Sequence, residues 1–104
     1  MKIQCECGVL VYDGTDGLSH KAHVVPDRLI EQVWDAADFA IEKSGPSPKE
    51  KEAACMKFRS VLGSSSRLAY QCSNCGRLFV YDSSRHLHTF VPASPEVSKD
   101  VFNA

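Results

Sequence analysis

The sequence has no long hydrophobic run and no strong excess of either charge. None of its apolar stretches approaches the roughly 18 residues that a membrane-spanning helix requires. The formal net charge is -1 at pH 7, which gives no general attraction to nucleic acid or to an anionic membrane. Binding to either would therefore need a local patch of basic residues.

Signals for export and for catalysis are also lacking. Met1-Lys2 leads directly into a cysteine-bearing segment without the apolar region of a signal peptide, so we expect a cytoplasmic protein. The sequence contains no phosphate-binding loop, no paired-carboxylate signature and no Ser/His/Asp arrangement. We therefore expect that the protein is not an enzyme.

Four of the five cysteines occur as two short pairs, Cys5-Glu6-Cys7-Gly8 and Cys72-Ser73-Asn74-Cys75-Gly76. In a reducing compartment, paired cysteines favour a metal over a disulfide. A tetrahedral metal takes four thiolates from two such pairs, and pairs so far apart can meet only if the chain folds back on itself. We therefore predict one structural Zn(Cys)4 site, closed to water, with the ligands Cys5, Cys7, Cys72 and Cys75. Iron in the same four-sulfur site is the alternative metal.

The segments around the two pairs are similar to each other. Residues 1–26 and 67–92 each contain three short stretches with strand-like alternation, separated by turns. The sequence Val-Tyr-Asp follows each cysteine pair, at 11–13 and at 80–82. The chain is therefore interpreted as a pseudo-repeat of two β units.

Between the two units the hydrophobic period becomes helical. From Asp27, apolar residues recur at i, i+3 and i+4, and acidic residues form a stripe on the opposite side. Gly45-Pro46 predicts the end of this helix, and Ser47-Pro48-Lys49-Glu50 has the form of a capping box that starts a second one. We expect a helical hairpin over residues 27–63 that covers a sheet. Its contacts would join Trp34, Ile41, Phe58 and Leu62 to strand residues such as Leu10, Val24, Leu78 and Phe90.

The second cysteine pair, Cys72-Ser73-Asn74-Cys75-Gly76 between two strand-like segments, resembles the knuckle of the zinc-ribbon superfamily and of rubredoxin-type proteins. The resemblance implies a small antiparallel sheet in which a second knuckle completes a tetrahedral metal site. Cys5-Glu6-Cys7-Gly8 is one residue shorter, so we expect it not to form the same turn with its amide-to-sulfur hydrogen bonds. Cysteines at i and i+2 still point to one side of an extended strand, so both can bind one metal.

The predicted fold is therefore α+β: a zinc-ribbon-like antiparallel β-sheet from two end units, with an inserted helical hairpin. We expect a single domain over residues 1–104. Its parts would be a first β unit (1–26), the hairpin (27–63), a second β unit (67–92) and a loosely held tail (93–104). The helical insertion is not part of the ribbon pattern, and ribbon proteins serve many functions, so the fold alone selects none of them.

The other potential metal ligands have weaker signals. The histidines form two pairs, His20 with His23 and His86 with His88, which could build a second metal site or replace a knuckle cysteine. Each pair offers only two ligands, so we favour ordinary hydrogen-bonded roles for them. Cys55 lies near the apolar face of the second helix and is expected to be a buried structural thiol.

Three functions are compatible with this sequence. The first is a non-enzymatic interaction or regulatory module with structural zinc and a protein partner, for which the acidic helix stripe could bind basic groups. The second is a nucleic-acid-binding ribbon, because Arg67, Arg77 and Arg85 alternate with aromatic residues. The third is a redox or metal-responsive protein with a labile first cysteine pair. We favour the first.

Overall fold

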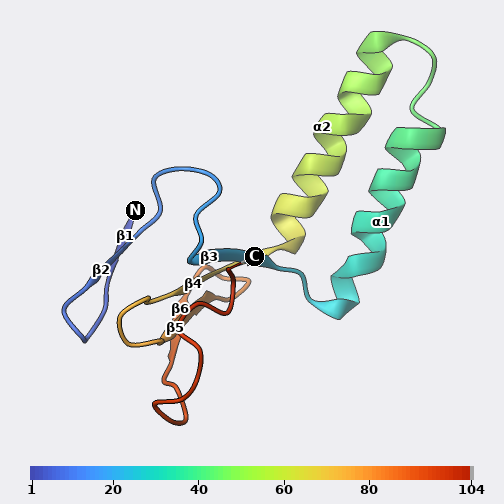
Figure 1. Ribbon diagram of the computed structural model, residues 1–104. Helices are drawn as coiled ribbons and strands as arrows, with labels where there is room; N and C mark the ends of the chain where they lie inside the picture. Colours follow the sequence, from blue (N-terminus) through green and yellow to red (C-terminus); the bar gives the residue numbers. More distant parts are fainter. Residues whose placement is uncertain (104) are drawn as a thin grey trace. The chain divides into compact units, whose positions relative to one another are not determined.

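The computed structural model describes residues 1–103, and the chain is α+β as predicted. It forms two compact units. One unit combines Met1–Val24 with the chain from Arg67 onward, and the other is Val25–Ser66. The elements of both units are labelled in Figure 1.

The helical unit is a hairpin of α1 (Asp27–Glu42) and α2 (Pro48–Ser65). At the predicted capping box, Ser47 Oγ accepts a hydrogen bond of 3.1 Å from the N–H of Glu50 and donates one of 2.8 Å to Glu50 Oε1. Helix α1 ends at Glu42 with Lys43 as its C-cap, and Gly45, two residues later, has a φ of 95°, the left-handed conformation predicted for it. Within residues 1–103, neither helix combines the length and the apolarity needed to cross a bilayer.

The contact between the two helices buries few side chains. Val33 of α1 and Ala54 and Ser65 of α2 are buried, and Gln32 donates a hydrogen bond of 2.6 Å to Ser65 Oγ. Phe58 and Leu78 are half-buried, but the other six residues expected to be covered are exposed in the structure: Trp34, Ile41, Leu62, Leu10, Val24 and Phe90. Their predicted burial is therefore wrong, because helical and strand periodicity identifies an apolar face but not what covers it.

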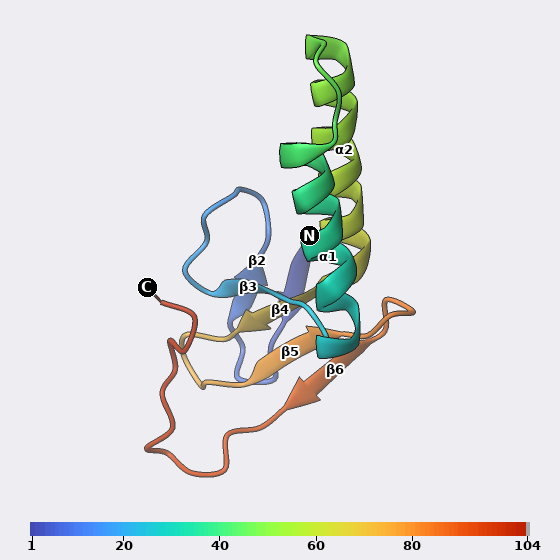
Figure 2. The ribbon, with the colours of Figure 1, turned by 90° about the vertical axis from the view of Figure 1, so that its right-hand side faces the viewer.

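The other unit contains two antiparallel sheets. The smaller pairs β1 (Lys2–Gln4) with β2 (Leu10–Tyr12). The larger has the order β3-β4-β5-β6, with β3 at Lys21–Val24, β4 at Arg67–Gln71, β5 at Leu78–Tyr81 and β6 at Leu87–Phe90. Figure 2 shows β4, β5 and β6 as neighbouring strands.

Strand β3 shows how the two end units combine. It pairs with β4, from Lys21 opposite Tyr70 to Val24 opposite Arg67, so a strand of the first end unit extends the sheet of the second. The prediction of a sheet from both end units is thus confirmed. The pseudo-repeat is incomplete, however, because β5 pairs with β6 whereas β2 pairs with β1 and not with β3.

The core of this unit contains two of the knuckle cysteines. Ile3 and Val11 come from the small sheet, and Tyr70 and Phe79 come from the large one. Cys5 and Cys72 complete the same buried cluster. The cysteine pairs therefore lie where apolar residues of both sheets pack together, so the hydrophobic core and the thiols position each other.

The C-terminal tail is attached through the side chain of Gln71, which is only 2% exposed. Gln71 Nε2 donates hydrogen bonds to the carbonyls of Ser98 at 2.9 Å and Gly76 at 3.2 Å. Its Oε1 accepts the N–H of Val101 at 2.8 Å. The expectation of a loosely held tail is therefore wrong at these positions, because a buried amide obtains its hydrogen-bond partners from an otherwise polar segment.

Candidate metal centre

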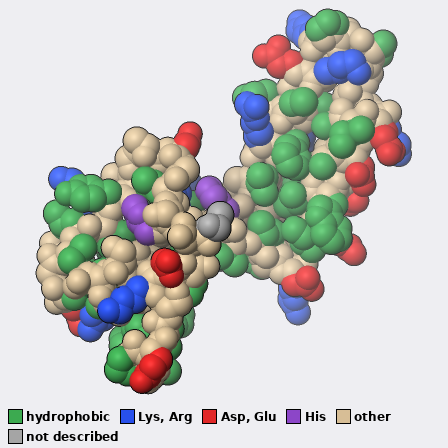
Figure 3. Space-filling view, viewed as in Figure 1, with side chains coloured by type: hydrophobic (Ala, Val, Ile, Leu, Met, Phe, Trp, Pro, Cys, Tyr) green, Lys and Arg blue, Asp and Glu red, His purple; other side chains and the backbone are tan. Residues whose placement is uncertain are grey.

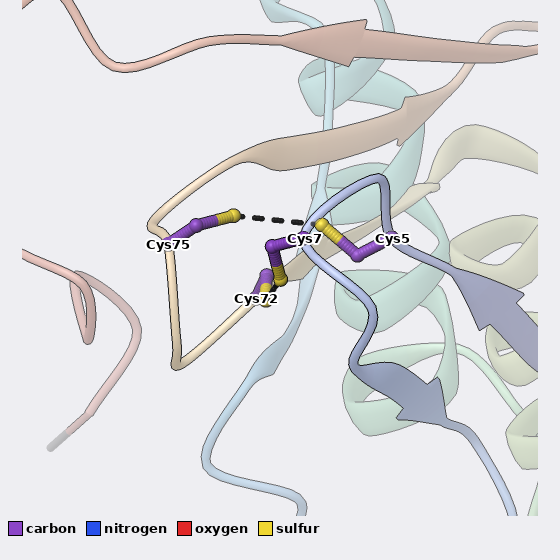
Figure 4. Close-up of side chains that lie close together, drawn as sticks. All are labelled: Cys5, Cys7, Cys72 and Cys75. Carbon is purple, nitrogen blue, oxygen red and sulfur yellow. Dashed lines mark hydrogen bonds between the residues drawn. The ribbon is translucent and has the colours of Figure 1, made fainter.

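The four knuckle cysteines converge in the structure as predicted (Figure 4). Cys5 Sγ lies 3.5 Å from Cys75 Sγ, and Cys7 Sγ lies 3.6 Å from Cys72 Sγ. All four sulfurs lie within 4.8 Å of one another. A tetrahedral ion with metal–sulfur bonds of about 2.3 Å would separate its sulfurs by about 3.8 Å. The group therefore has the spacing of a four-cysteine metal site.

The distances also exclude disulfides in this structure. A disulfide bond joins sulfurs at about 2.0 Å, far less than the 3.5 Å between Cys5 and Cys75 or the 3.6 Å between Cys7 and Cys72. All five cysteines of the chain are free thiols. The cluster thus has the reduced form that a metal requires of its ligands.

The two turns that hold the cysteines share one hydrogen-bond pattern. The first cysteine of each pair donates its N–H to the carbonyl of the residue after the glycine, at 3.0 Å for Cys5 and 2.9 Å for Cys72. Its carbonyl accepts the N–H of the glycine, at 3.0 Å for Gly8 and 2.8 Å for Gly76. Both glycines have positive φ, 98° and 85°. The two turns thus close with the same pair of hydrogen bonds, but the first turn is one residue shorter, because Gly8 follows Cys5 by three residues and Gly76 follows Cys72 by four.

The surroundings of the first cysteine pair shift the pKa values of its two thiols in opposite directions. Burial raises the pKa of Cys5 to about 12, although the main-chain amide of Cys7 hydrogen-bonds to its sulfur. The pKa of Cys7 is lowered to about 6, first by the side-chain amide of Asn74, 3.4 Å from the sulfur, and then by the amide of Val9. The turn itself differs from the second one, as predicted, because it closes over one residue fewer.

Arg77 supplies positive charge to the cluster. Burial acts to raise the pKa of Cys75, but hydrogen bonds from the main-chain amide and the guanidinium of Arg77 outweigh it, so the pKa is lowered. The guanidinium Nη1 lies 3.2 Å from Cys75 Sγ, and Nη2 lies 3.8 Å from a carboxylate oxygen of Glu6. Both contacts direct the positive charge toward the cysteine turns, where it favours thiolates.

Asn74 and Arg77 are site residues that the sequence did not reveal. Asn74 lies inside the second cysteine pair, and Arg77 follows its glycine, so their proximity to sulfur was visible. Arg77 was instead considered as a contact for nucleic acid. A residue's position beside a ligand does not determine the direction of its side chain, and this direction depends on the second turn meeting the first.

The chemistry of the cluster follows from its donors and its burial. Cys5 and Cys72 are 1% and 0% exposed, whereas Cys7 and Cys75 are more accessible. Four sulfur donors complete a tetrahedral coordination and leave no position for water or substrate, which is typical of structural sites. The group can hold a soft metal ion, and the buried pair would shield it from solvent.

The histidines have other partners in the structure. His20 Nε2 lies 2.6 Å from the carbonyl oxygen of Tyr12, and His88 Nε2 lies 2.8 Å from Asp82 Oδ2. His86 Nδ1 is 3.8 Å from the same carboxylate oxygen. Within residues 1–103, the four cysteines are the only group of three or more potential ligands close enough to share a metal ion. The hydrogen-bonded roles of His20 and His88 are thus confirmed.

Cys55 is exposed on α2 and lies outside the cluster. The prediction that it is a buried structural thiol is therefore wrong. It follows the buried Ala54 directly, and a step of one residue along a helix rotates the side chain by about 100°, away from the contact with α1.

The fold and the site together define an α+β protein with a four-cysteine group that can hold a metal ion. The chain belongs to the family described as Domain of unknown function (DUF8617), whose model matches residues 1–97. This match includes both cysteine pairs and the helical hairpin, so all three belong to one family domain. Comparisons with curated proteins and with solved structures gave no match.

Proposed function

We propose that this is a small zinc-binding protein whose Zn(Cys)4 site is structural, and that it acts as a non-enzymatic interaction or regulatory module. The observation that carries the proposal is the convergence of four sulfurs within 4.8 Å from turns more than sixty residues apart. The residues that would hold the ion are Cys5, Cys7, Cys72 and Cys75.

The surroundings of the sulfurs support a zinc site of the zinc-ribbon type. Zinc prefers a tetrahedral set of thiolates, and both turns end in a glycine with positive φ whose N–H hydrogen-bonds to the carbonyl of the first cysteine. Four thiolates and one Zn²⁺ would have a net charge of about -2. The guanidinium of Arg77 and the amide of Asn74 contact two of the sulfurs and would offset part of this charge.

The size of the unit supports a structural role for the ion. Strands β1 and β2 have three residues each, too few for an isolated two-stranded sheet to be stable. Structural zinc contributes an apparent binding free energy of about 10–16 kcal/mol, comparable to the whole stability of a small domain, about 5–15 kcal/mol. A metal that links the β1–β2 turn to the β4–β5 turn would therefore contribute much of the stability of this unit.

A protein partner is favoured over nucleic acid. Of the three arginines considered for phosphate binding, Arg77 is directed to Cys75 and is paired with Glu6. A phosphate would have to compete with these contacts, and only three basic side chains were available for the nucleic-acid hypothesis. The closed set of four sulfur donors also gives no support to a catalytic role.

Native mass spectrometry with elemental analysis of the purified full chain tests the proposal. We expect one zinc per chain, with complete loss in Cys72→Ser and full retention in Cys55→Ser, the matched control outside the cluster. Visible absorption bands from iron–thiolate charge transfer would show that the bound metal is iron and not zinc. A metal-free protein that folds normally would refute the proposal.

Thiol titration separates a stable structural site from a redox-responsive one. In the zinc-loaded protein we expect the exposed Cys55 to react first and the four cluster thiols to react only after the metal is removed. Rapid modification of Cys7 and release of zinc under mild oxidation would instead favour the redox-responsive function.

A further inference from the structure

The helical hairpin has an apolar surface that its own two helices do not bury. Trp34 is 59% exposed, Ile41 is 77% exposed and Leu62 is 36% exposed. Figure 3 shows hydrophobic side chains gathered across both helices on the face turned to the viewer. Contiguous exposed apolar surface of this kind marks interaction sites in soluble proteins.

Helical periodicity places these residues in two parallel stripes. Ile30, Trp34, Ala37 and Ile41 are spaced by four, three and four residues and so share one side of α1. Phe58 and Leu62 share one side of α2 in the same way. Viewed along its own axis, each stripe is rotated away from the buried contact residue of its helix, Val33 on α1 and Ala54 on α2, in the direction in which the chain turns from N to C. The two helices run antiparallel and face each other, so these equal rotations bring both stripes to the same side of the hairpin. We call this side the apolar face.

The two edges of the apolar face carry opposite charge. α1 contains five acidic residues and one basic residue, a net charge of -4. α2 contains four basic and two acidic residues, a net charge of +2. On α1, Glu31 and Asp38 lie next to the apolar stripe on the side away from α2. On α2, Lys51 lies in the stripe, and Arg59 lies beyond it beside Glu52, so two basic residues and one acidic residue leave this edge with a net positive charge.

We propose that the occupant of the apolar face is the same face of a second copy of this chain. In this dimer, α1 of each copy lies antiparallel to α2 of the other, which makes a four-helix arrangement with a twofold axis parallel to the helices. The acidic edge of each α1 then meets the basic edge of the partner's α2. The inference goes beyond the proposed zinc function and does not depend on it.

The charges select this arrangement over the other symmetric one. A twofold axis perpendicular to the helices would place α1 against α1 of the second copy. The acidic edges would then face each other, and like charges across an interface are unfavourable. Pairing of α1 with α2 instead brings opposite charges together twice in each dimer.

Sedimentation velocity and tryptophan fluorescence on the full chain test the dimer together. Trp34 is the only tryptophan, so its emission reports directly on the apolar face. We expect a mass that rises from 11.5 kDa to twice that value with concentration, and a shift of Trp34 emission to shorter wavelength over the same range. A monomer at all concentrations overturns the proposal. Blue-shifted Trp34 emission in such a monomer would assign the face to a contact within the same chain.

Two charge-reversed variants test the pairing of the helices. Variant one carries Glu31→Lys and Asp38→Lys, and variant two carries Lys51→Glu and Arg59→Glu. We expect each alone to raise the dimer dissociation constant about tenfold or more, and an equimolar mixture to restore association as a mixed dimer. If variant two alone associates as well as the wild type, α1 does not face α2 and the proposed arrangement is overturned.

A pair of apolar variants completes the test. Trp34→Ala should weaken association, whereas Met56→Ala, at an exposed position of α2 outside the apolar face, should leave it unchanged. Circular dichroism shows whether each variant keeps its helices. Zinc content is measured on the same samples, so failure of the dimer and failure of the proposed metal site appear as separate results. Equal dissociation constants for both variants would overturn the proposed face.

Discussion

The guanidinium of Arg77 donates a hydrogen bond of 3.2 Å to Sγ of Cys75. This contact joins a residue of the second turn to one of the four converging sulfurs, and the same guanidinium lies 3.8 Å from Glu6 in the first turn. Burial acts to raise the pKa of Cys75, but the main-chain amide and then the guanidinium of Arg77 lower it, and the hydrogen bond to Cys75 raises the pKa of Arg77. The cation is thus part of the environment that makes the cysteines suitable for a metal.

Removal of this cation should weaken metal binding without abolishing it. We expect Arg77→Met to raise the zinc dissociation constant about 10- to 100-fold, the usual effect of losing a residue that contacts a metal ligand. Competition with a coloured chelator measures the change. Arg85→Asn is the control, because Arg85 is exposed in the β5–β6 turn and asparagine tolerates its φ of 63°. An unchanged affinity in Arg77→Met would contradict the role given to this residue.

Loss of one ligand should destabilise the whole β unit. Cys72 is fully buried in the core beside Ile3 and Tyr70, so Cys72→Ser would remove a ligand and leave a buried hydroxyl in an apolar site. We expect Cys72→Ser to lower the free energy of unfolding by several kcal/mol or to prevent folding of this unit. Thermal denaturation with and without a chelator measures the effect.

The matched control for this prediction is Cys55→Ser, since Cys55 is exposed on α2. Its melting temperature should match that of the wild type, and chelation should lower both equally. Identical melting curves for Cys72→Ser and the wild type would show that the cysteine cluster does not stabilise the fold.

The carboxylate of Asp82 should titrate well below its usual range. A hydrogen bond from His88 and main-chain amides of the β5–β6 turn lower the pKa of Asp82 from 3.8 to about 2. Because the folded-state pKa is the lower one, the stabilisation is present above about pH 4 and is lost as the pH falls through 2. Carboxyl chemical shifts measured by NMR should give this midpoint directly.

Substitution of His88 separates its effect on the pKa of Asp82 from that of the main-chain amides. His88→Ala should raise the pKa of Asp82 toward 3.8, and the amides of Ser84 and His86, 2.8 and 2.9 Å from Asp82 Oδ1, should hold it part of the way down. His23→Ala, in the first β unit, should leave it unchanged. A midpoint near 3.8 in the wild type would show that the β5–β6 turn is not formed as described.

Gln71 should attach the tail to the second cysteine turn. Gln71→Ala would remove the bonds to the carbonyls of Gly76 and Ser98 and to the N–H of Val101, and we expect a loss of about 1–3 kcal/mol in the free energy of unfolding. Urea denaturation measures the loss, and amide exchange at Val101 should become much faster.

Truncation of the chain after Ala93 removes the tail residues that hydrogen-bond to Gln71. Because Ser98 and Val101 are then absent, Gln71→Ala should lower the free energy of unfolding less in the truncated chain than in the full chain. Equal costs in both chains would show that the tail does not depend on Gln71.

Local sequence signals were sufficient for the helices and for the metal ligands. The capping box at Ser47-Pro48-Lys49-Glu50 and the glycine at Gly45 predicted the start of α2 and the end of α1, because caps act within one turn of the chain. The two cysteine pairs predicted four converging thiols, because a tetrahedral metal requires such a set. These features depend on neighbouring residues or on a known coordination number.

Other features were decided by contacts between distant segments. The alternation of Lys21–Val24 is the same whether this strand joins β2 or β4, and only the assembled ladder selects β4. The charge of Arg77 was visible, but its direction toward Cys75 arises because the second turn meets the first. Likewise, the amide of Gln71 became an anchor for the tail when folding buried it.

The sequence by itself therefore determined the two helices, the two glycine-terminated cysteine turns and the set of four thiols. Only the tertiary structure decided which strands pair, where Arg77 and Gln71 point, and which apolar side chains of the hairpin stay exposed. The physical reason is range: helix caps and turns are set by bonds within a few residues, whereas strand pairing and burial depend on partners that the chain brings together only on folding.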